Sequence, residues 1–61
     1  MGNKGIKILI VEDDETLLEM YSLKLAEEGF TFFTASDGDI GLEVALKEKP
    51  DVILLDIMMP K

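Results

Sequence analysis

Two short, almost continuously apolar segments constrain this chain more than any other feature. Residues 6–11 and 51–56 are rich in Ile, Val and Leu, and acidic residues follow the first segment and stand at both ends of the second. Such runs are typical of strands buried on both faces, as in a parallel sheet that helices cover. A third, Thr-rich and aromatic segment, residues 30–35, predicts a strand between them.

Two helices are expected in the intervening segments. The first follows Asp14, which is a good N-cap, and ends before Gly29, with an inward stripe formed by Leu18, Tyr21 and Leu25. The second is expected over residues 40–49, because residues 36–39 favour a turn and Pro50 cannot continue a helix. Its expected inward residues are Ile40 and Val44, with either Ala45 or Leu46.

The predicted element order is β-α-β-α-β, which indicates an α/β fold with a parallel sheet. Right-handed crossovers place one helix on each face when the second crossover passes over the first strand. The expected strand order is then 2-1-3, with the first strand central. No linker or repeat divides the 61 residues, so one domain over residues 1–61 is expected.

Composition removes several classes of function. The chain has no Cys and no His, which excludes a disulfide framework, zinc fingers and thiol or imidazole catalysis. Its net charge is −7, and its lysines are scattered along the sequence, so no basic patch for binding nucleic acid is expected. No apolar run approaches the length of a membrane span or a signal peptide, so we expect a cytoplasmic protein that binds neither membrane nor nucleic acid.

Three carboxylates are expected to converge at one edge of the sheet. The first and third strands are neighbours that end at the same edge, and these strands deliver Glu12, Asp13 and Asp56 to it. Ligands bind at this edge in open α/β sheets. Oxygen ligands alone favour Mg²⁺, with Mn²⁺ or Ca²⁺ as alternatives.

Asp56 is the strongest candidate nucleophile, because Cys and His are absent. At the end of a rigid strand, its carboxylate is well placed to attack an activated phosphoryl group. Glu12 and Asp13 would hold the metal that neutralises the charge developing there.

The chain resembles the receiver domain of bacterial response regulators. The resemblance rests on residues 8–14, on Asp37-Gly38 and on residues 50–60, in matching order and spacing. It implies a flavodoxin-like fold, a sensor histidine kinase as partner, and Asp56 as the phospho-accepting aspartate. It also implies that Glu12, Asp13, Asp56 and the backbone carbonyl of Met58 bind Mg²⁺.

The resemblance also implies that this chain matches only part of a receiver domain. Receiver domains have five strands and five helices, so residues 1–61 correspond to an amino-terminal half, and the family's switch Ser/Thr and its lysine at the end of the fifth strand have no counterpart. We therefore expect slow phosphorylation of Asp56, since one missing charge donor costs about 10²–10³ in rate. We also expect weak Mg²⁺ binding, because the loop that carries Met58 is a few residues from the chain end and should fray.

Two other functions remain open from the sequence. The chain can be a structural half-domain that self-associates, as a homodimer in which two third strands pair antiparallel in the order 2-1-3-3′-1′-2′. It can also be an aspartate-nucleophile phosphatase, but that class places a second Asp where Met58 stands. We expect a signalling module rather than an enzyme.

Overall fold

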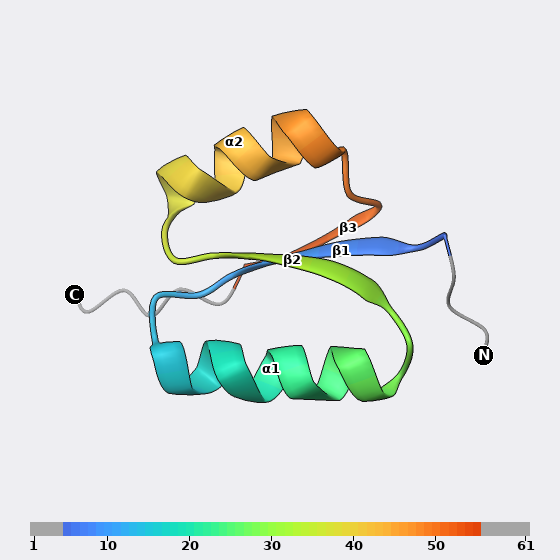
Figure 1. Ribbon diagram of the computed structural model, residues 1–61. Helices are drawn as coiled ribbons and strands as arrows, with labels where there is room; N and C mark the ends of the chain where they lie inside the picture. The colour runs from blue at the N-terminus through green and yellow to red at the C-terminus, as the bar shows by residue number, and fades with distance from the viewer. Residues whose placement is uncertain (1–4, 56–61) are drawn as a thin grey trace.

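The computed structural model describes residues 5–55 (Figure 1). Five elements alternate along the chain, as the sequence predicts. They are β1 (Lys7–Val11), α1 (Glu15–Glu27), β2 (Thr31–Ala35), α2 (Gly38–Glu48) and β3 (Val52–Leu55).

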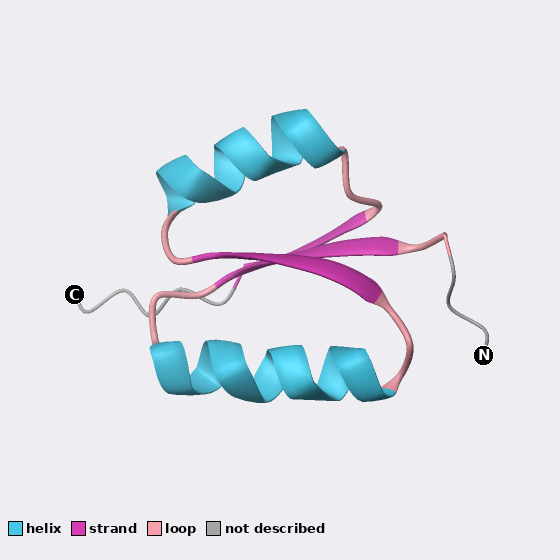
Figure 2. Ribbon diagram, in the orientation of Figure 1, coloured by secondary structure: helices cyan, strands magenta, loops and turns pink. Residues whose placement is uncertain are grey.

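The three strands form one parallel sheet in the order β2-β1-β3. Helices α1 and α2 lie on opposite faces of this sheet (Figure 2). The predicted α/β class, strand order and flavodoxin-like β-α-β-α-β arrangement are therefore confirmed. Among the described residues, neither helix combines the length and apolar character that crossing a membrane requires.

Aspartate side chains cap both helices. The Oδ1 atom of Asp14 accepts hydrogen bonds from the backbone N–H groups of Thr16 and Leu17, at 2.8 and 3.3 Å. The same atom of Asp37 accepts from the N–H of Ile40 at 2.9 Å. Helix α2 begins at Gly38, two residues before the predicted start at residue 40, because Asp37 acts as its N-cap.

The core lies around β1. Four consecutive β1 residues are buried, and Leu9, Val11 and Ala35 pack against the partly buried Phe33, Val44 and Ala45. The expected inward residues of α2 are only partly confirmed. Val44 and Ala45 face the core, whereas Ile40 and Leu46 are exposed, because α2 turns Gly41 and Ala45 toward the sheet.

The start of β3 is fixed to the start of β1. The backbone N–H of Lys7 donates to the Asp51 carboxylate, and the backbone N–H of Asp51 donates to the Lys7 carbonyl, both at 2.8 Å. The Lys7 ammonium also donates to the Glu48 carbonyl at 2.9 Å. These three bonds join segments more than 40 residues apart and hold the register between the two strands.

Strand β3 is the least covered part of the sheet. All four of its residues are exposed, and it packs against β1 but against neither helix. Val52 and Leu54 share one face with their register partners Ile8 and Ile10, and Ile53 shares the other face with Leu9. Both faces of β3 are therefore apolar and open.

We predict that Gly41→Ala destabilises the fold. A Cβ atom at residue 41 would lie 2.8 Å from Cγ2 of Val11, a buried β-branched side chain that cannot easily turn away. Overpacking should outweigh the gain in helix propensity and lower the free energy of unfolding by about 1–2 kcal/mol. Urea titration followed by circular dichroism measures this change.

Gly38→Ala is the matched control, because a Cβ at residue 38 meets nothing within 4 Å. It should leave stability equal or slightly higher. Equal effects of the two substitutions would contradict the close approach of α2 to β1.

Candidate functional site

The predicted site lies where β1 and β3 end. The two strands are parallel neighbours, and the last residue of β1, Val11, is in register with the last residue of β3, Leu55. Glu12 directly follows Val11, and Asp56 directly follows Leu55 in the sequence. The register therefore supports the expectation that these acids share one edge, although Asp56 and Met58 lie outside the described residues.

Glu12 is the fully buried acidic residue of the described chain. Its backbone N–H donates to the Ala35 carbonyl at 3.0 Å, which extends the pairing of β1 with β2 by one residue. Its Oε2 atom accepts a hydrogen bond from the backbone N–H of Asp14 at 2.9 Å. The Glu12 carboxylate thus lies at the end of β1, and its bond to Asp14 fixes the loop that leads into α1.

Asp13 and Asp14 differ in what their carboxylates can do. Asp13 is exposed, so its carboxylate can reach a solvated ion. The Asp14 carboxylate is engaged in capping α1. Of the three consecutive acids, Glu12 and Asp13 are therefore the two whose carboxylates do not cap α1, and their role as metal ligands stays a prediction.

Within residues 5–55, no three acidic side chains gather closely enough to hold a metal ion. Glu12 and Asp13 supply two hard oxygen groups, which is the donor chemistry that Mg²⁺ requires. The residues present fit Mg²⁺, with further ligands expected from residues 56–61.

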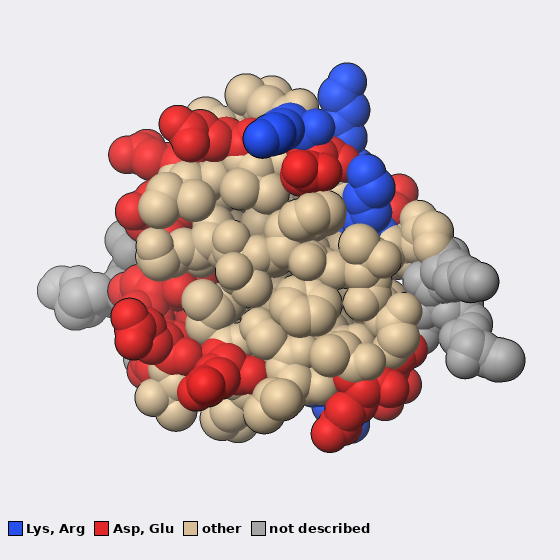
Figure 3. Space-filling model, in the orientation of Figure 1, with Lys and Arg blue, Asp and Glu red and all other residues tan. Residues whose placement is uncertain are grey.

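Charge is distributed unevenly between the two ends of the sheet. Acidic residues crowd the end where the strands finish and the helices begin: Glu12, Asp13, Asp14, Glu15, Asp37 and Asp39. Every lysine within residues 5–55 lies where strands begin or helices end: Lys7, Lys24, Lys47 and Lys49. In Figure 3 red atoms gather along the first end, and blue atoms gather by the end of α2. The site is thus strongly negative and attracts cations.

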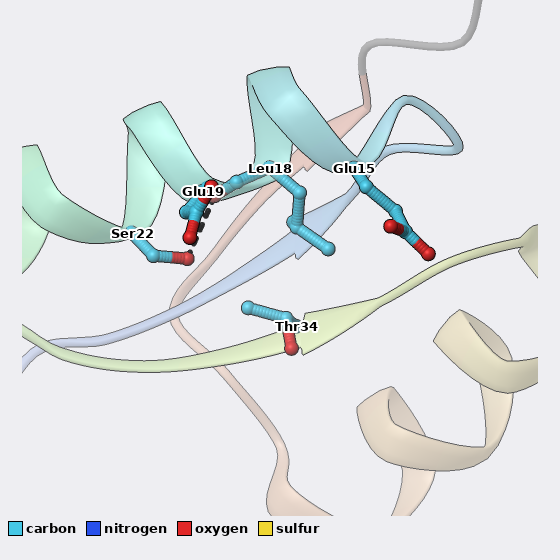
Figure 4. Close-up of a pocket in the computed structure, with 5 residues that line it drawn as sticks. All are labelled: Glu15, Leu18, Glu19, Ser22 and Thr34. Atoms are coloured by element: carbon cyan, nitrogen blue, oxygen red, sulfur yellow. Dashed lines mark hydrogen bonds between the residues drawn. The ribbon is translucent and has the colours of Figure 1, made fainter.

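A separate hollow of about 420 Å³ lies between α1 and β2. Glu15, Leu18, Glu19, Ser22 and Thr34 line it (Figure 4). The Ser22 hydroxyl donates to the Leu18 carbonyl at 2.8 Å, so this hydroxyl is tied to its own helix. The hollow adjoins β2, at the opposite edge of the sheet from β3, and it is not part of the predicted site.

Comparison with known proteins identifies a family. The family described as "Response regulator receiver domain" matches residues 8–61. The alkaline phosphatase synthesis transcriptional regulatory protein PhoP of Bacillus subtilis is 46% identical over 55 residues, which cover 90% of this chain and 23% of that protein. The probable transcriptional regulatory protein TcrX of Mycobacterium tuberculosis is 40% identical over 55 residues, covering 90% of this chain and 24% of TcrX.

The probable transcriptional regulator ycf27 of Guillardia theta is 44% identical over 55 residues, covering 90% of this chain and 22% of its own length. This chain therefore spans about a quarter of the length of these curated relatives. No solved structure matches it significantly.

We predict that Glu12 substitutions separate the structural role of this residue from its charge. Glu12→Ala removes the acceptor of the Asp14 N–H and leaves a cavity, so the free energy of unfolding should fall by about 1–3 kcal/mol. Glu12→Gln keeps an acceptor oxygen and the shape, so stability should be retained. Urea unfolding of the two variants without added metal measures the difference, and equal losses would contradict the assigned hydrogen bond.

Proposed function

This chain belongs to the response regulator receiver domain family, and on that premise we propose that it acts as a phospho-acceptor module of bacterial two-component signal transduction. Its proposed partner is a sensor histidine kinase, and its proposed location is the cytoplasm. Asp56 is the proposed acceptor of the phosphoryl group. We propose an acceptor rather than a turnover enzyme, because Met58 stands where aspartate phosphatases carry a second Asp.

The observation that carries this proposal is the register of β1 with β3. Because Val11 pairs with Leu55, the residues after them emerge from adjacent strands at the same edge of the sheet. A carboxylate at the end of β3 could then reach an ion held at the end of β1. Phosphoryl transfer depends mostly on the positioning of the reacting groups and on charge stabilisation. The adjacent ends of β1 and β3 support the proposed positioning.

Glu12 and Asp13 are the proposed carboxylate ligands of Mg²⁺, or of Mn²⁺ in its place, together with Asp56 and the Met58 carbonyl. When bound, the ion would neutralise negative charge on the transferring phosphoryl oxygens. The burial of Glu12 and its bond to the Asp14 N–H support a pre-positioned ligand, while the exposed Asp13 suits contact through water. The proposed task of the protein residues is therefore to hold the ion and orient the acceptor.

Strand β3 supports a second candidate role. Its four apolar residues are all exposed, and no charged residue interrupts them, so the strand is suited to pairing with another chain. A homodimer joined through β3 would extend the sheet without any phosphoryl transfer. In this role the chain would serve as a self-associating structural half-domain.

We predict slow phosphorylation of Asp56 by acetyl phosphate in the presence of Mg²⁺. Every lysine of residues 5–55 lies away from the carboxyl ends of the strands, so this part of the chain places no basic side chain beside the acceptor. One such missing donor lowers the rate by about 10²–10³. Intact mass analysis over time, with peptide mapping, measures the rate and the modified residue.

Asp56→Asn is the control for this reaction and should abolish labelling. Labelling that persists in Asp56→Asn, or that maps to another residue, would contradict the acceptor assignment. A rate equal to that of a longer receiver domain would contradict the expected need for a basic side chain.

We predict weak Mg²⁺ binding that depends on the carboxylates at the strand ends. Glu12→Gln and Asp13→Asn should each weaken binding in a calorimetric titration, since each removes a negative charge from the site. Glu19→Gln, in the hollow beside β2, is the control and should bind as the native chain does. Binding that is lost in Glu19→Gln but kept in Glu12→Gln and Asp13→Asn would place the ion in that hollow instead.

A further inference from the structure

Strand β2 forms the edge of the sheet that lies on the opposite side of β1 from β3. The backbone N–H of Glu12 donates to the Ala35 carbonyl, so the backbone polar groups of Ala35 point toward β1. Successive residues of a strand direct these groups to alternate sides. The N–H and C=O groups of Phe32 and Thr34 therefore point away from β1, which is the strand that β2 pairs with in residues 5–55.

Nothing in the sequence of β2 discourages the addition of another strand. Edge strands commonly avoid such pairing through a Lys, a Pro or an inward charge. Residues 31–35 contain neither a charged residue nor a Pro. Phe32 and Phe33 lie on opposite faces of the sheet, and each is only partly buried. A strand added here would cover apolar surface on both faces and would also satisfy the outward backbone groups.

The hollow between α1 and β2 adjoins this edge and determines which charge the edge accepts. Thr34 lines the hollow from the strand, while Glu15 and Glu19 line it from α1 (Figure 4). Both glutamates are exposed, and no lysine is among the described residues that line the hollow. Like charges four residues apart on a helix repel each other. A cationic side chain placed between the two carboxylates would relieve this repulsion.

We propose that the edge of β2 binds an extended, basic segment of another protein, which adds to the sheet as a further strand. The backbone of this segment pairs with the outward groups of Phe32 and Thr34. Neighbouring strands lie about 4.8 Å apart, so the residue opposite Thr34 stands at the mouth of the hollow. A Lys or Arg there lays its aliphatic part toward Leu18 and its charge between Glu15 and Glu19.

The same geometry defines a short pattern in the partner. Side chains two residues apart on a strand share one face, so an apolar side chain two residues from the cation stands beside Phe32. In this mode of recognition, backbone hydrogen bonds supply affinity and alternate side chains supply specificity. The partner segment therefore carries a basic and an apolar residue at alternate positions.

The distribution of charge favours this partner over a second copy of the chain. Residues 29–37, which include β2 and its flanks, contain no Lys, so an identical strand brings no cation to the hollow. A second copy would also bring another pair of glutamates to an edge that already carries two. A basic segment supplies the charge that this edge lacks.

A ¹H–¹⁵N NMR titration of the 61-residue chain tests the proposal with the acetylated and amidated peptide Thr-Val-Thr-Lys-Thr-Val-Thr. We expect saturable shifts at the amides of Glu15, Glu19, Phe32 and Thr34. The same peptide with Glu in place of Lys should bind at least tenfold more weakly. The absence of saturable shifts at these amides would overturn the proposal. Shifts there that follow protein concentration without peptide would assign the edge to a second copy and overturn it as well.

Thr34→Pro tests the backbone pairing. Proline removes an N–H that points away from β1, so the hydrogen bonds between β1 and β2 remain. This variant should bind the lysine peptide at least tenfold more weakly. Thr34→Val is the matched control, because it keeps the N–H and loses only the hydroxyl, and it should bind within about twofold of the native chain. Equal binding by the two variants would overturn strand addition.

Glu19→Gln keeps the test valid if circular dichroism shows that Thr34→Pro does not fold. It should weaken binding of the lysine peptide several-fold, and adding Glu15→Gln should weaken binding further. Glu27→Gln removes the same charge from an exposed residue of α1 that does not line the hollow, and it should bind as the native chain does. Equal weakening by Glu19→Gln and Glu27→Gln would indicate attraction to the acidic chain as a whole and overturn the proposed site.

Discussion

The parallel pairing of β1 with β3 sets the geometry of both the candidate site and the uncovered strand. It joins segments more than 40 residues apart, and the bonds among Lys7, Glu48 and Asp51 fix where it starts. Pairing of segments so far apart in the chain must offset the conformational entropy that closing the loop between them removes. Because the pairing has one register, it also determines which residues emerge together at the opposite edge.

The helices cover the sheet unequally, and this asymmetry gives the molecule two distinct surfaces. Both helices pack on β1 and β2, which buries β1 almost completely. Neither helix reaches β3, whose apolar residues stay exposed on both faces. The polar, acidic end of the sheet is suited to cations, and the uncovered strand is suited to another polypeptide. Signalling and association are thus proposed for different parts of one small sheet.

Much of the fold follows from local rules that the sequence displays, whereas the position of α2 across the sheet does not. The apolar runs predict β1 and β3, and burial of Glu12 follows from its place at the end of a central strand. Asp56 and Met58 are assigned by sequence alone, since both lie outside the described residues. The spacing of apolar residues along a helix does not determine where that helix packs across a sheet. From the sequence, either Ala45 or Leu46 could therefore face the core. The close approach of α2 to the sheet turns Ala45 inward and Leu46 outward.

Whether the acids at the ends of β1 and β3 form one cation site is tested most directly by a Mg²⁺ titration followed by ¹H–¹⁵N NMR spectra. We expect shifts confined to the amides of Glu12, Asp13, Asp14 and residues 56–59, with Lys7 and Asp51 at the other end unchanged. Shifts centred on the hollow beside β2, or spread evenly over all acidic residues, would contradict a shared site at the strand ends.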